Sequence, residues 1–506
     1  MATLSFAELA EARGLLVEPL LDRVIGAGLR AAARAGATYA DLRIVRRRHE
    51  VISTREDHVV DVGSSQSYGV GVRVIANGAW GFAATSRVDP SEVARAAALA
   101  ADIARANAKL LRQPVRLAAE PVHADVWQTP MVKDPFRVPL ESKVELLLAA
   151  NAEALKVPGV KYVSSRFEAL GDWKLFASTE GSYIEQNIVR VGPSFTPTAI
   201  DPRTGEFESR NHSIAPMQAG WEYVEDALLP NDARRIGEEA VAKLKAPSVQ
   251  PGKKDLVLSP DNLWLTIHES VGHPTELDRA LGYEANYAGT SFATPDKRNK
   301  LQYGTPVVNL YADKTTPGAL ATCGYDDDGV KTQRWDIVKG GVFVGYQTTR
   351  EQAGWIGEER SRGTSYAQDF KSFPFQRMPN LSLAPGAKDL SKEQLIAAVD
   401  DGVYIEGNGS YSIDQQRYNF QFSGQMFWAI KNGKLAGPLK DVAYQSNTLD
   451  FWNRCELLGS AKTWALGGSL HDGKGEPSQS NAVSHGCPVT LFRQINVLNT
   501  NRRRTA

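Results

Sequence analysis

Two stretches near the start of the chain alternate apolar and polar residues, and this alternation limits what the chain can fold into more than any other feature. Residues 39–62, YADLRIVRRRHEVISTREDHVVDV, have the two-residue period of half-buried strands. Residues 68–85, YGVGVRVIANGAWGFAAT, predict a hairpin that turns at Asn77 and Gly78. No helix start follows the glycine-rich YGVGV, so we interpret it as a strand and not as a phosphate-binding loop. A β-sheet is therefore the expected framework of the N-terminal part.

Helical patterns flank these strands. Residues 16–35 have a helical period that stops near Gly36, and a second helix to about Leu111 begins with a capping box of Asp89 and Glu92. The same criteria predict helices over 141–155 and 232–245, with strands within 160–170 and 172–193.

The pattern breaks at residues 246–254, APSVQPGKK, which we interpret as a domain boundary. Beyond it, residues 325–349 and 418–444 predict hairpin-like strand pairs, and a short helix with Ser391 as N-cap lies between them. The second half is therefore expected to be rich in strands.

A chain of 506 residues exceeds one ordinary domain. The predicted fold is α+β in two parts. The N-terminal α+β region, residues 1–249, forms either one domain or two (1–125 and 126–249). The C-terminal domain, residues 250–506, is strand-rich and carries the helix described next.

A helix predicted from Ser259, its N-cap, contains two histidines five residues apart, His268 and His273. Each residue of a regular helix advances by about 100°, so five steps leave the two rings about 140° apart. Gly272 and Pro274 flank the second histidine, and both disfavour a regular continuation. We expect the helix to end here or to widen into a π turn, which would bring the two imidazoles together.

Glu269 directly follows the first histidine. In a metal hydrolase, such a carboxylate takes a proton from the activated water and passes it to the leaving group. A catalytic zinc keeps three protein ligands and one open position, so a third ligand must come from elsewhere. The alternative is chance spacing, with His268 half-buried and His273 a cation favoured at a helix C-terminus.

The helix resembles that of the TldD/PmbA family of cytoplasmic metallopeptidases, whose active members carry H-E-x-x-x-H. Further segments are similar to that family in the same order: residues 68–83, 324–341 (GYDDDGVKTQRWDIVKGG), 360–386 (RSRGTSYAQDFKSFPFQRMPNLSLAPG) and 473–488 (GKGEPSQSNAVSHGCP). The resemblance runs from about residue 38 to the C-terminus. It favours the metal-bearing TldD type, because the partner type lacks the His-Glu motif.

The resemblance implies that His268 and His273 are metal ligands and that Glu269 is the catalytic glutamate. The family's third ligand is a cysteine immediately before the GK of the last segment. Asp472 occupies that place here, beside His471. Either residue can bind zinc, the expected divalent metal, although an oxygen ligand makes the site harder than a thiolate and favours other divalent metals, or the metal is lost.

Other residues receive weaker assignments. Arg362 and Tyr366 match the family's R-x-x-S-Y segment and are expected either to bind substrate or to brace the fold. Cys487 is a less favoured third ligand, and Cys323 and Cys455 are expected to be structural thiols. His485 is interpreted as a turn residue rather than a partner of a ligand, and the acidic run 326–328 as a solvated turn rather than a cation site.

The resemblance implies a metal-dependent peptidase that hydrolyses unfolded or extended peptides in an enclosed cavity. It also implies a dimer, either of identical chains or with a PmbA/TldE-like homologue. The alternative is a catalytically inactive homologue that acts as a peptide-binding or partner subunit. A metal-dependent hydrolase of a non-peptide bond is a third possibility.

Composition narrows the setting. The formal net charge is +0, which gives no reason to expect binding to nucleic acid or to an anionic membrane. The basic runs 46–48 and 502–504 are expected to be solvated. The three cysteines are far apart, which is typical of reduced thiols in a cytoplasmic protein. Neither a signal peptide nor an apolar run of about 18 residues is found, so no membrane span is expected.

Overall fold

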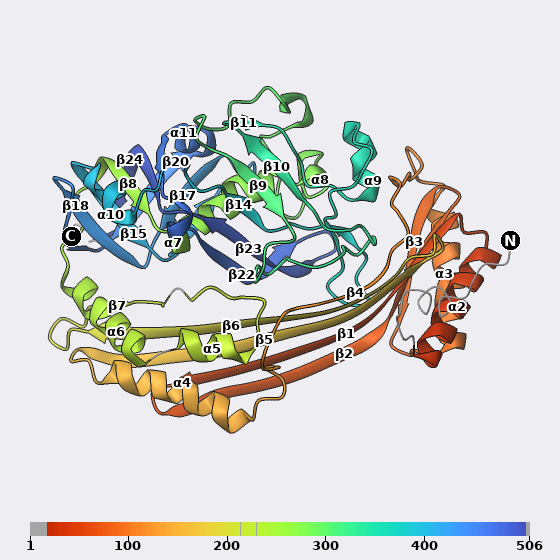
Figure 1. Ribbon diagram of the computed structural model, residues 1–506, viewed down its shortest axis with the longest axis horizontal. Helices are drawn as coiled ribbons and strands as arrows, with labels where there is room; N and C mark the ends of the chain where they lie inside the picture. Colours follow the sequence, from red (N-terminus) through yellow and green to blue (C-terminus); the bar gives the residue numbers. More distant parts are fainter. Residues whose placement is uncertain (1–17, 213, 229, 502–506) are drawn as a thin grey trace.

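The computed structural model describes residues 18–501, except 213 and 229. Figure 1 shows two layers, in which a long curved sheet from the N-terminal half carries a C-terminal body on its concave side. The fold is α+β with a strand-rich C-terminal part, which confirms the predicted fold class. The expectations for the N-terminal segment before residue 18 and for residues 502–504 lie outside the described residues. Within the described range, no helix is long and apolar enough to cross a membrane.

The N-terminal sheet has the strand order β3-β2-β1-β5-β6-β4, with β7 beside β6. Its four longest strands contain 17 to 19 residues and pair antiparallel. The hairpin turn at Asn77 and Gly78 is confirmed, and both residues have a positive φ (52° and 77°), as a tight two-residue turn requires. The strands are β1 (Tyr39–Arg55), β2 (His58–Ala76), β3 (Ala79–Thr85), β4 (Ala124–Gln128), β5 (Val160–Ser178), β6 (Tyr183–Ile200) and β7 (Phe207–Ser209).

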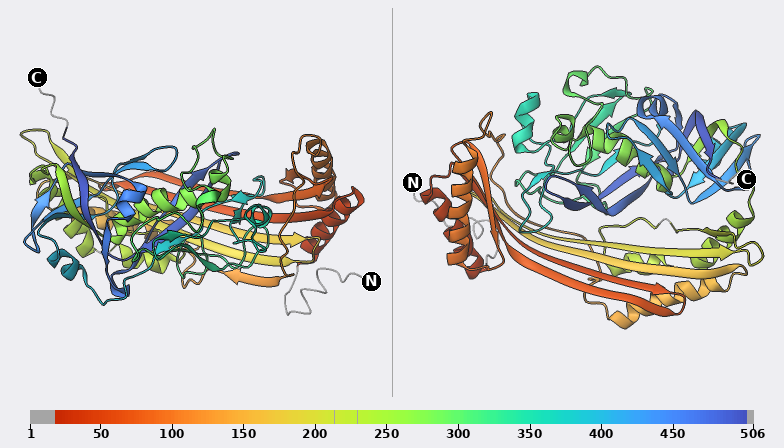
Figure 2. Two further views of the ribbon diagram at one scale, coloured as in Figure 1. Left: turned by 90° about the horizontal axis from the view of Figure 1, so that it is seen from above. Right: turned by 180° about the vertical axis from the view of Figure 1, so that it is seen from behind.

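Helices cover both ends of the convex face of this sheet (Figure 2). α2 and α3 pack on apolar side chains of the first strands, such as Leu42 and Val72. The other helices pack on β5 and β6 around Phe167 and Val191. The predicted cap of α3 is present, since the Asp89 carboxylate accepts two backbone N–H bonds. The helices are α2 (Pro19–Arg34), α3 (Pro90–Asn107), α4 (Leu140–Leu155), α5 (Trp221–Ala227) and α6 (Pro230–Lys245).

The C-terminal half is built around a mixed sheet in the order β16-β17-β20-β24-β8-β15-β18-β19, with β21 beside β24. α7 follows β8 and buries Leu263 and Ile267 in the core of this half. The strands are β8 (Gly252–Leu258), β15 (Asp401–Glu406), β16 (Tyr411–Ile413), β17 (Asn419–Ser423), β18 (Met426–Lys431), β19 (Lys434–Leu439), β20 (Val442–Asn447), β21 (Cys455–Leu458) and β24 (Thr490–Asn499).

Smaller elements complete this half. The helices are α7 (Pro260–Ile267), α8 (Leu277–Ala280), α9 (Arg350–Ala353), α10 (Lys392–Ala397) and α11 (Thr448–Trp452). One small sheet has the order β11-β10-β9-β14, and two others are the pairs β12-β13 and β22-β23. Their strands are β9 (Leu310–Asp313), β10 (Arg334–Lys339), β11 (Val342–Phe343), β12 (Ser365–Tyr366), β13 (Phe375–Gln376), β14 (Leu381–Leu383), β22 (Ala465–Lys474) and β23 (Gln479–Cys487).

The acidic run 326–328 joins the two halves, so the prediction of a solvated turn is wrong. Its three aspartates are only 3–6% exposed. Asp328 pairs with Arg73 of β2 at 2.6 Å, and Asp327 pairs with Lys174 of β5 at 2.7 Å. The acids are buried because the concave face of the N-terminal sheet supplies buried cations opposite them, which the local sequence does not reveal.

Candidate metal centre

The helix that carries both histidines widens where the sequence predicts. α7 ends at Ile267 and is followed by a π turn, His268–Gly272, and a 3₁₀ turn, His273–Thr275. The N–H of His273 bonds to the carbonyl of His268, five residues earlier. The extra residue in this turn brings the two imidazoles to one side, with ring centroids 4.6 Å apart.

Neighbouring side chains hold the widened turn by bonding to its carbonyl groups. The hydroxyl of Tyr303 donates to the carbonyl of Ser270. The side-chain amide of Gln347 donates to the carbonyl of Gly272 at 2.6 Å. A Cβ at Gly272 would lie 2.5 Å from the sulfur of Met378, so any larger residue here would force the buried Met378 side chain to move. The π turn is therefore supported by tertiary contacts as well as by its own sequence.

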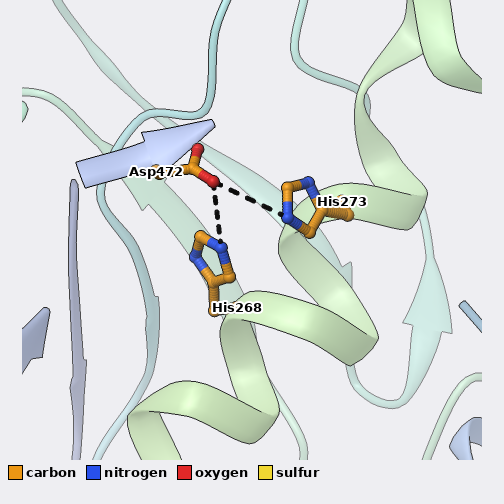
Figure 3. Close-up of side chains that lie close together, drawn as sticks. All are labelled: His268, His273 and Asp472. Carbon is orange, nitrogen blue, oxygen red and sulfur yellow. Dashed lines mark ion pairs between the residues drawn. The ribbon is translucent and has the colours of Figure 1, made fainter. Parts of the chain in front are cut away.

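His268, His273 and Asp472 converge on one point (Figure 3). Oδ1 of Asp472 lies 3.4 Å from Nε2 of His268 and 3.8 Å from Nε2 of His273. Asp472 comes from β22, whose pairing with β23 shifts register between Ser469 and Asp472. Among the described residues, this is the one group of three His, Cys, Asp or Glu side chains placed to hold a metal ion.

A partner on the far side of each of these three side chains fixes its orientation. The partners are His485 Nε2 for His268 Nδ1 (2.8 Å), Glu276 Oε2 for His273 Nδ1 (3.0 Å) and Arg377 Nη2 for Asp472 Oδ2 (3.1 Å). With these bonds made, both Nε2 atoms and Oδ1 face one another. Metal-binding histidines usually donate their second N–H in this way, so the arrangement is typical of a metal site.

His485 was missed by the sequence analysis, which interpreted it as a turn residue. The structure places it within β23, near the end of the strand, with a fully buried side chain. Burial, and then the neighbouring His268, lower its pKa to about 3, so its imidazole is neutral. Glu276 carries a weak signal in the sequence, because a carboxylate three residues after a histidine lies near it on a helical turn.

Burial and charge together set the protonation of the cluster. Burial raises the pKa of Asp472, but His268 and then His273 outweigh burial and hold this pKa far below its usual value. Burial lowers the pKa of His268, yet the Asp472 carboxylate outweighs it and raises this pKa. For His273, burial and then the Arg417 guanidinium lower the pKa well below its usual value. Without a metal, the cluster therefore contains an ionised Asp472 carboxylate, a neutral His273 imidazole and a His268 ring whose proton Asp472 favours. A divalent metal binds neutral imidazole and would displace that proton from His268.

An open cleft of about 630 Å³ leads to these side chains. Glu269 lines it, and the Glu269 carboxylate pairs with Arg417 from the turn between β16 and β17. The cleft is lined by Trp264, Leu265, His268, Glu269, His273, Asn408, Tyr411, Ser412, Ile413, Arg417, Ser469, His471, Asp472 and Gly473. The three converging side chains and the predicted general base therefore share one solvent-accessible space.

His471 and Cys487 do not join the cluster. The ring of His471 bonds through Nε2 to Glu168 of the N-terminal sheet at 2.7 Å, and its side chain is 53% exposed. It points away from Asp472 because neighbouring strand residues face opposite sides. The thiol of Cys487 is buried and lies 3.6 Å from the carbonyl of Pro260.

Arg362 and Tyr366 are also placed outside the cleft. Arg362 pairs with Glu358 at 3.0 Å. The hydroxyl of Tyr366 lies 3.3 Å from the carbonyl of Ser480, which it donates to. These contacts match the alternative interpretation, in which both residues brace the fold.

Comparison with known proteins gives consistent matches over most of the chain. Three family models match in order: PmbA/TldA metallopeptidase domain 1 over residues 40–104, the central domain over 133–246, and the C-terminal domain over 251–499. A metalloprotease of Methanothermobacter thermautotrophicus is 29% identical over 91% of this chain and 95% of its own length. A protein described as a zinc metalloprotease TldD homolog, from Saccharolobus solfataricus, is 24% identical over 93% of this chain and 98% of its own.

Two solved structures share the fold. A putative modulator of DNA gyrase from Bacteroides thetaiotaomicron superposes with a TM-score of 0.72 at 18% identity, covering 94% of this chain and 98% of that chain. TldE from Thermococcus kodakarensis superposes with a TM-score of 0.67 at 15% identity, covering 93% and 98%. At such identities these likenesses describe the fold alone.

Proposed function

Because the chain belongs to the PmbA/TldA metallopeptidase family, we propose that it is a metal-dependent peptidase of the TldD type. The observation that supports this most is the convergence of His268, His273 and Asp472 beside Glu269 in one open cleft. The relatives described as metalloproteases match 91% and 93% of this chain.

The donor set fits a divalent metal. Two imidazole nitrogens and one carboxylate oxygen are ligands that zinc accepts, and a three-ligand set leaves a position open for catalysis. His268, His273 and Asp472 would hold the ion. When bound, it supplies Lewis acidity toward a peptide carbonyl and lowers the pKa of a water molecule.

We assign the role of general base to Glu269, which lines the cleft together with the three converging side chains. Its carboxylate accepts a proton from the attacking water and then delivers that proton to the leaving amine. Arg417 pairs with one oxygen of this carboxylate and so fixes its orientation in the cleft. The side chain of Arg417 is itself only 13% exposed, which limits its freedom to move.

An extended peptide is the substrate that suits the cleft. Tyr411, Ser412 and Ile413 of β16 line it, and β16 ends the C-terminal sheet with no strand paired to its outer edge in the part of the chain that the structure describes. A peptide that adds to this edge as a strand would pass Glu269. We expect a partner subunit to close the cleft into a cavity.

The partner is either a second copy of this chain or a PmbA/TldE-like homologue. β2 offers a contact surface, because among the described residues β3 pairs only with its last part, from Val70 to Ala76. The free part exposes Val59, Val60 and Val62 by 40–59%. An unpaired apolar edge of this kind favours association with another chain. The buried, free cysteines suit the cytoplasm that we propose as its location.

One observation favours the alternative of an inactive homologue. Arg377 pairs with the Asp472 carboxylate, so a buried cation already balances the charge that a metal would use. In that case the chain would bind peptides or a partner without hydrolysing them.

Metal analysis separates the two functions. Purified wild-type protein supplied with Zn²⁺ should retain a stoichiometric amount after gel filtration, and the variants His268→Ala and Asp472→Ala should not. Glu269→Gln should keep the metal and lose about 10²–10⁴-fold in the rate of cleavage of an unfolded peptide. Wild-type protein that stays empty of metal would exclude the peptidase function.

A further inference from the structure

His485 lies behind the metal centre in a position that fixes its ring. It sits on β23 opposite Gly467 of β22 and is fully buried. Its ring is parallel to that of Trp264, with 6.2 Å between centroids and 6° between planes. A Cβ at Gly467 would overlap the Trp264 ring, so the absence of a side chain there lets the indole fill this space. The imidazole of His485 therefore has little freedom to turn.

Two hydrogen bonds decide which nitrogen of His485 carries the proton. Nδ1 lies 2.8 Å from the backbone carbonyl of Leu381, and a carbonyl can only accept, so Nδ1 is the donor. Nε2 lies 2.8 Å from Nδ1 of His268. Neither bond involves a carboxylate, and a buried imidazolium without a counter-ion is costly, so the ring is neutral and Nε2 is a bare acceptor.

The consequence passes to His268. Because Nε2 of His485 can only accept, Nδ1 of His268 must carry a hydrogen and donate it. That leaves Nε2 of His268, 3.4 Å from Oδ1 of Asp472, as the nitrogen that would bind a metal, in place of any proton shared with Asp472. A chain of hydrogen bonds from the Leu381 carbonyl through two imidazoles therefore sets the tautomer of a ligand.

The second histidine ligand is supported differently. His273 donates to the carboxylate of Glu276, which lies near two buried cations, Lys474 at 3.2 Å and Arg279 at 3.6 Å. One imidazole is thus supported by a charged acceptor and the other by a neutral acceptor. The neutral acceptor adds no negative charge to a site that already contains Asp472.

We propose that His485 is a positioning residue of the metal centre, which holds His268 in the tautomer and orientation that bind the ion. This inference rests on the proposed metallopeptidase function. It extends the site from β22 and the π turn to the C-terminal part of β23 and the backbone of β14.

The test compares two substitutions of His485. His485→Phe keeps a flat ring against Trp264 but removes the acceptor, whereas His485→Gln retains an amide oxygen that can accept from His268. Zn²⁺ affinity is measured by competition with a chromogenic chelator at neutral pH, and the visible spectrum of the Co²⁺-loaded protein reports ligand geometry. We expect His485→Phe to lose about 10–100-fold in Zn²⁺ affinity and to alter the Co²⁺ spectrum. His485→Gln should recover much of that affinity.

His123→Gln is the matched control, since His123 also makes a side-chain bond, to Glu120 at 3.1 Å, but lies in the N-terminal half, immediately before β4. It should bind Zn²⁺ as the wild type does. If His485→Phe fails to fold, the comparison rests on His485→Gln, whose affinity should lie below that of the wild type with a changed Co²⁺ spectrum. Variants that bind Zn²⁺ as tightly as the wild type, with unchanged spectra, would overturn the inference. Wild-type protein without metal affinity would instead overturn the proposed function.

Discussion

Asp472 is the residue that gives this metal centre its chemical character. It stands where the resemblance to TldD-type enzymes places a cysteine, so the donor set is two nitrogens and an oxygen. Arg377 balances its charge and also bonds to the carbonyl of Gln479 at 2.7 Å, so the arginine keeps a partner when the carboxylate is removed. A neutral residue at position 472 would therefore leave Arg377 with hydrogen-bond acceptors but without the carboxylate that balances its charge, whereas a thiolate would restore a negative charge beside it.

Asp472→Cys should raise the preference of the site for Zn²⁺ over Mn²⁺. Thiolate favours zinc, whereas carboxylate oxygen suits manganese, so the ratio of the two dissociation constants should change by about tenfold or more. Competition titrations of both ions measure this ratio. Asp472→Asn, which keeps the shape and loses the charge, should weaken both ions. An unchanged ratio in Asp472→Cys would show that residue 472 is not a ligand.

His212 links stability to pH far from the cleft. Burial and then Arg210 lower its pKa from 6.5 to about 4. Between these two pKa values the unfolded chain binds more protons than the folded one. The contribution of His212 to the free energy of unfolding is therefore fully present above pH 6.5 and is lost as the pH falls toward 4. The loss is roughly 3 kcal/mol at most.

His212→Gln should remove this part of the pH dependence. Chemical denaturation across the acidic range should give a shallower slope of unfolding free energy against pH than the wild type. His58, whose side chain is 61% exposed, is the control, and His58→Gln should leave the slope unchanged. Parallel slopes for His212→Gln and the wild type would contradict the assignment.

Residues differ in how far the sequence alone predicts them. His268 and His273 could be brought together from the sequence, because Gly272 and Pro274 act locally on the turn between them. The choice between His471 and Asp472 could not, since both residue types bind metals and the strand face decides. His485 could not either, because its role depends on His268, 217 residues away in the chain.

The π turn is the element on which the site depends. A regular helix would place the two imidazoles on different sides. The side chains of Tyr303 and Gln347 stabilise the π turn by donating hydrogen bonds to two of its backbone carbonyl groups. The strands and helices around it can be predicted from apolar periodicity and capping residues in the sequence. The side chains that stabilise the turn come from other elements, so the sequence predicts a distortion without predicting its support.

Gly272→Ala should lower the free energy of unfolding by about 1–3 kcal/mol, because the new Cβ overlaps the sulfur of Met378. In a Met378→Ala background the overlap is gone. The same change should then be neutral or should stabilise by up to about 1 kcal/mol, the advantage of alanine over glycine in a helix. Denaturant titrations of the wild type, Gly272→Ala, Met378→Ala and the double variant complete this double-mutant cycle. An equal effect of Gly272→Ala in both backgrounds would rule out this contact as the reason for glycine.

The two layers of the molecule are joined by a buried network of charges. Arg73 of β2 bonds to Asp41 of β1 at 2.7 Å and to Asp328 of the C-terminal half at 2.6 Å. Lys174 of β5 likewise pairs with Asp327 of the C-terminal half, at 2.7 Å. The α+β class could be predicted from the sequence, but this interface could not, because each charge has its partner in a distant part of the chain. The packing of the two layers is thus specified by ion pairs between residues far apart in the sequence, which local sequence patterns do not reveal.

Asp328→Asn tests the network at the scale of the whole molecule. The substitution keeps the hydrogen bond from Ser365 at 3.0 Å but leaves the buried Arg73 with one carboxylate instead of two. Breaking a buried pair typically costs several kcal/mol, and since Asp41 remains we expect a loss of about 3 kcal/mol in the free energy of unfolding. Tryptophan fluorescence during denaturation measures it, because the chain has tryptophans in both halves. The exposed pair of Lys462 and Asp389 provides the control, and Asp389→Asn should change stability by less than about 1 kcal/mol. Equal effects of the two substitutions would mean that the acidic run does not hold the layers together.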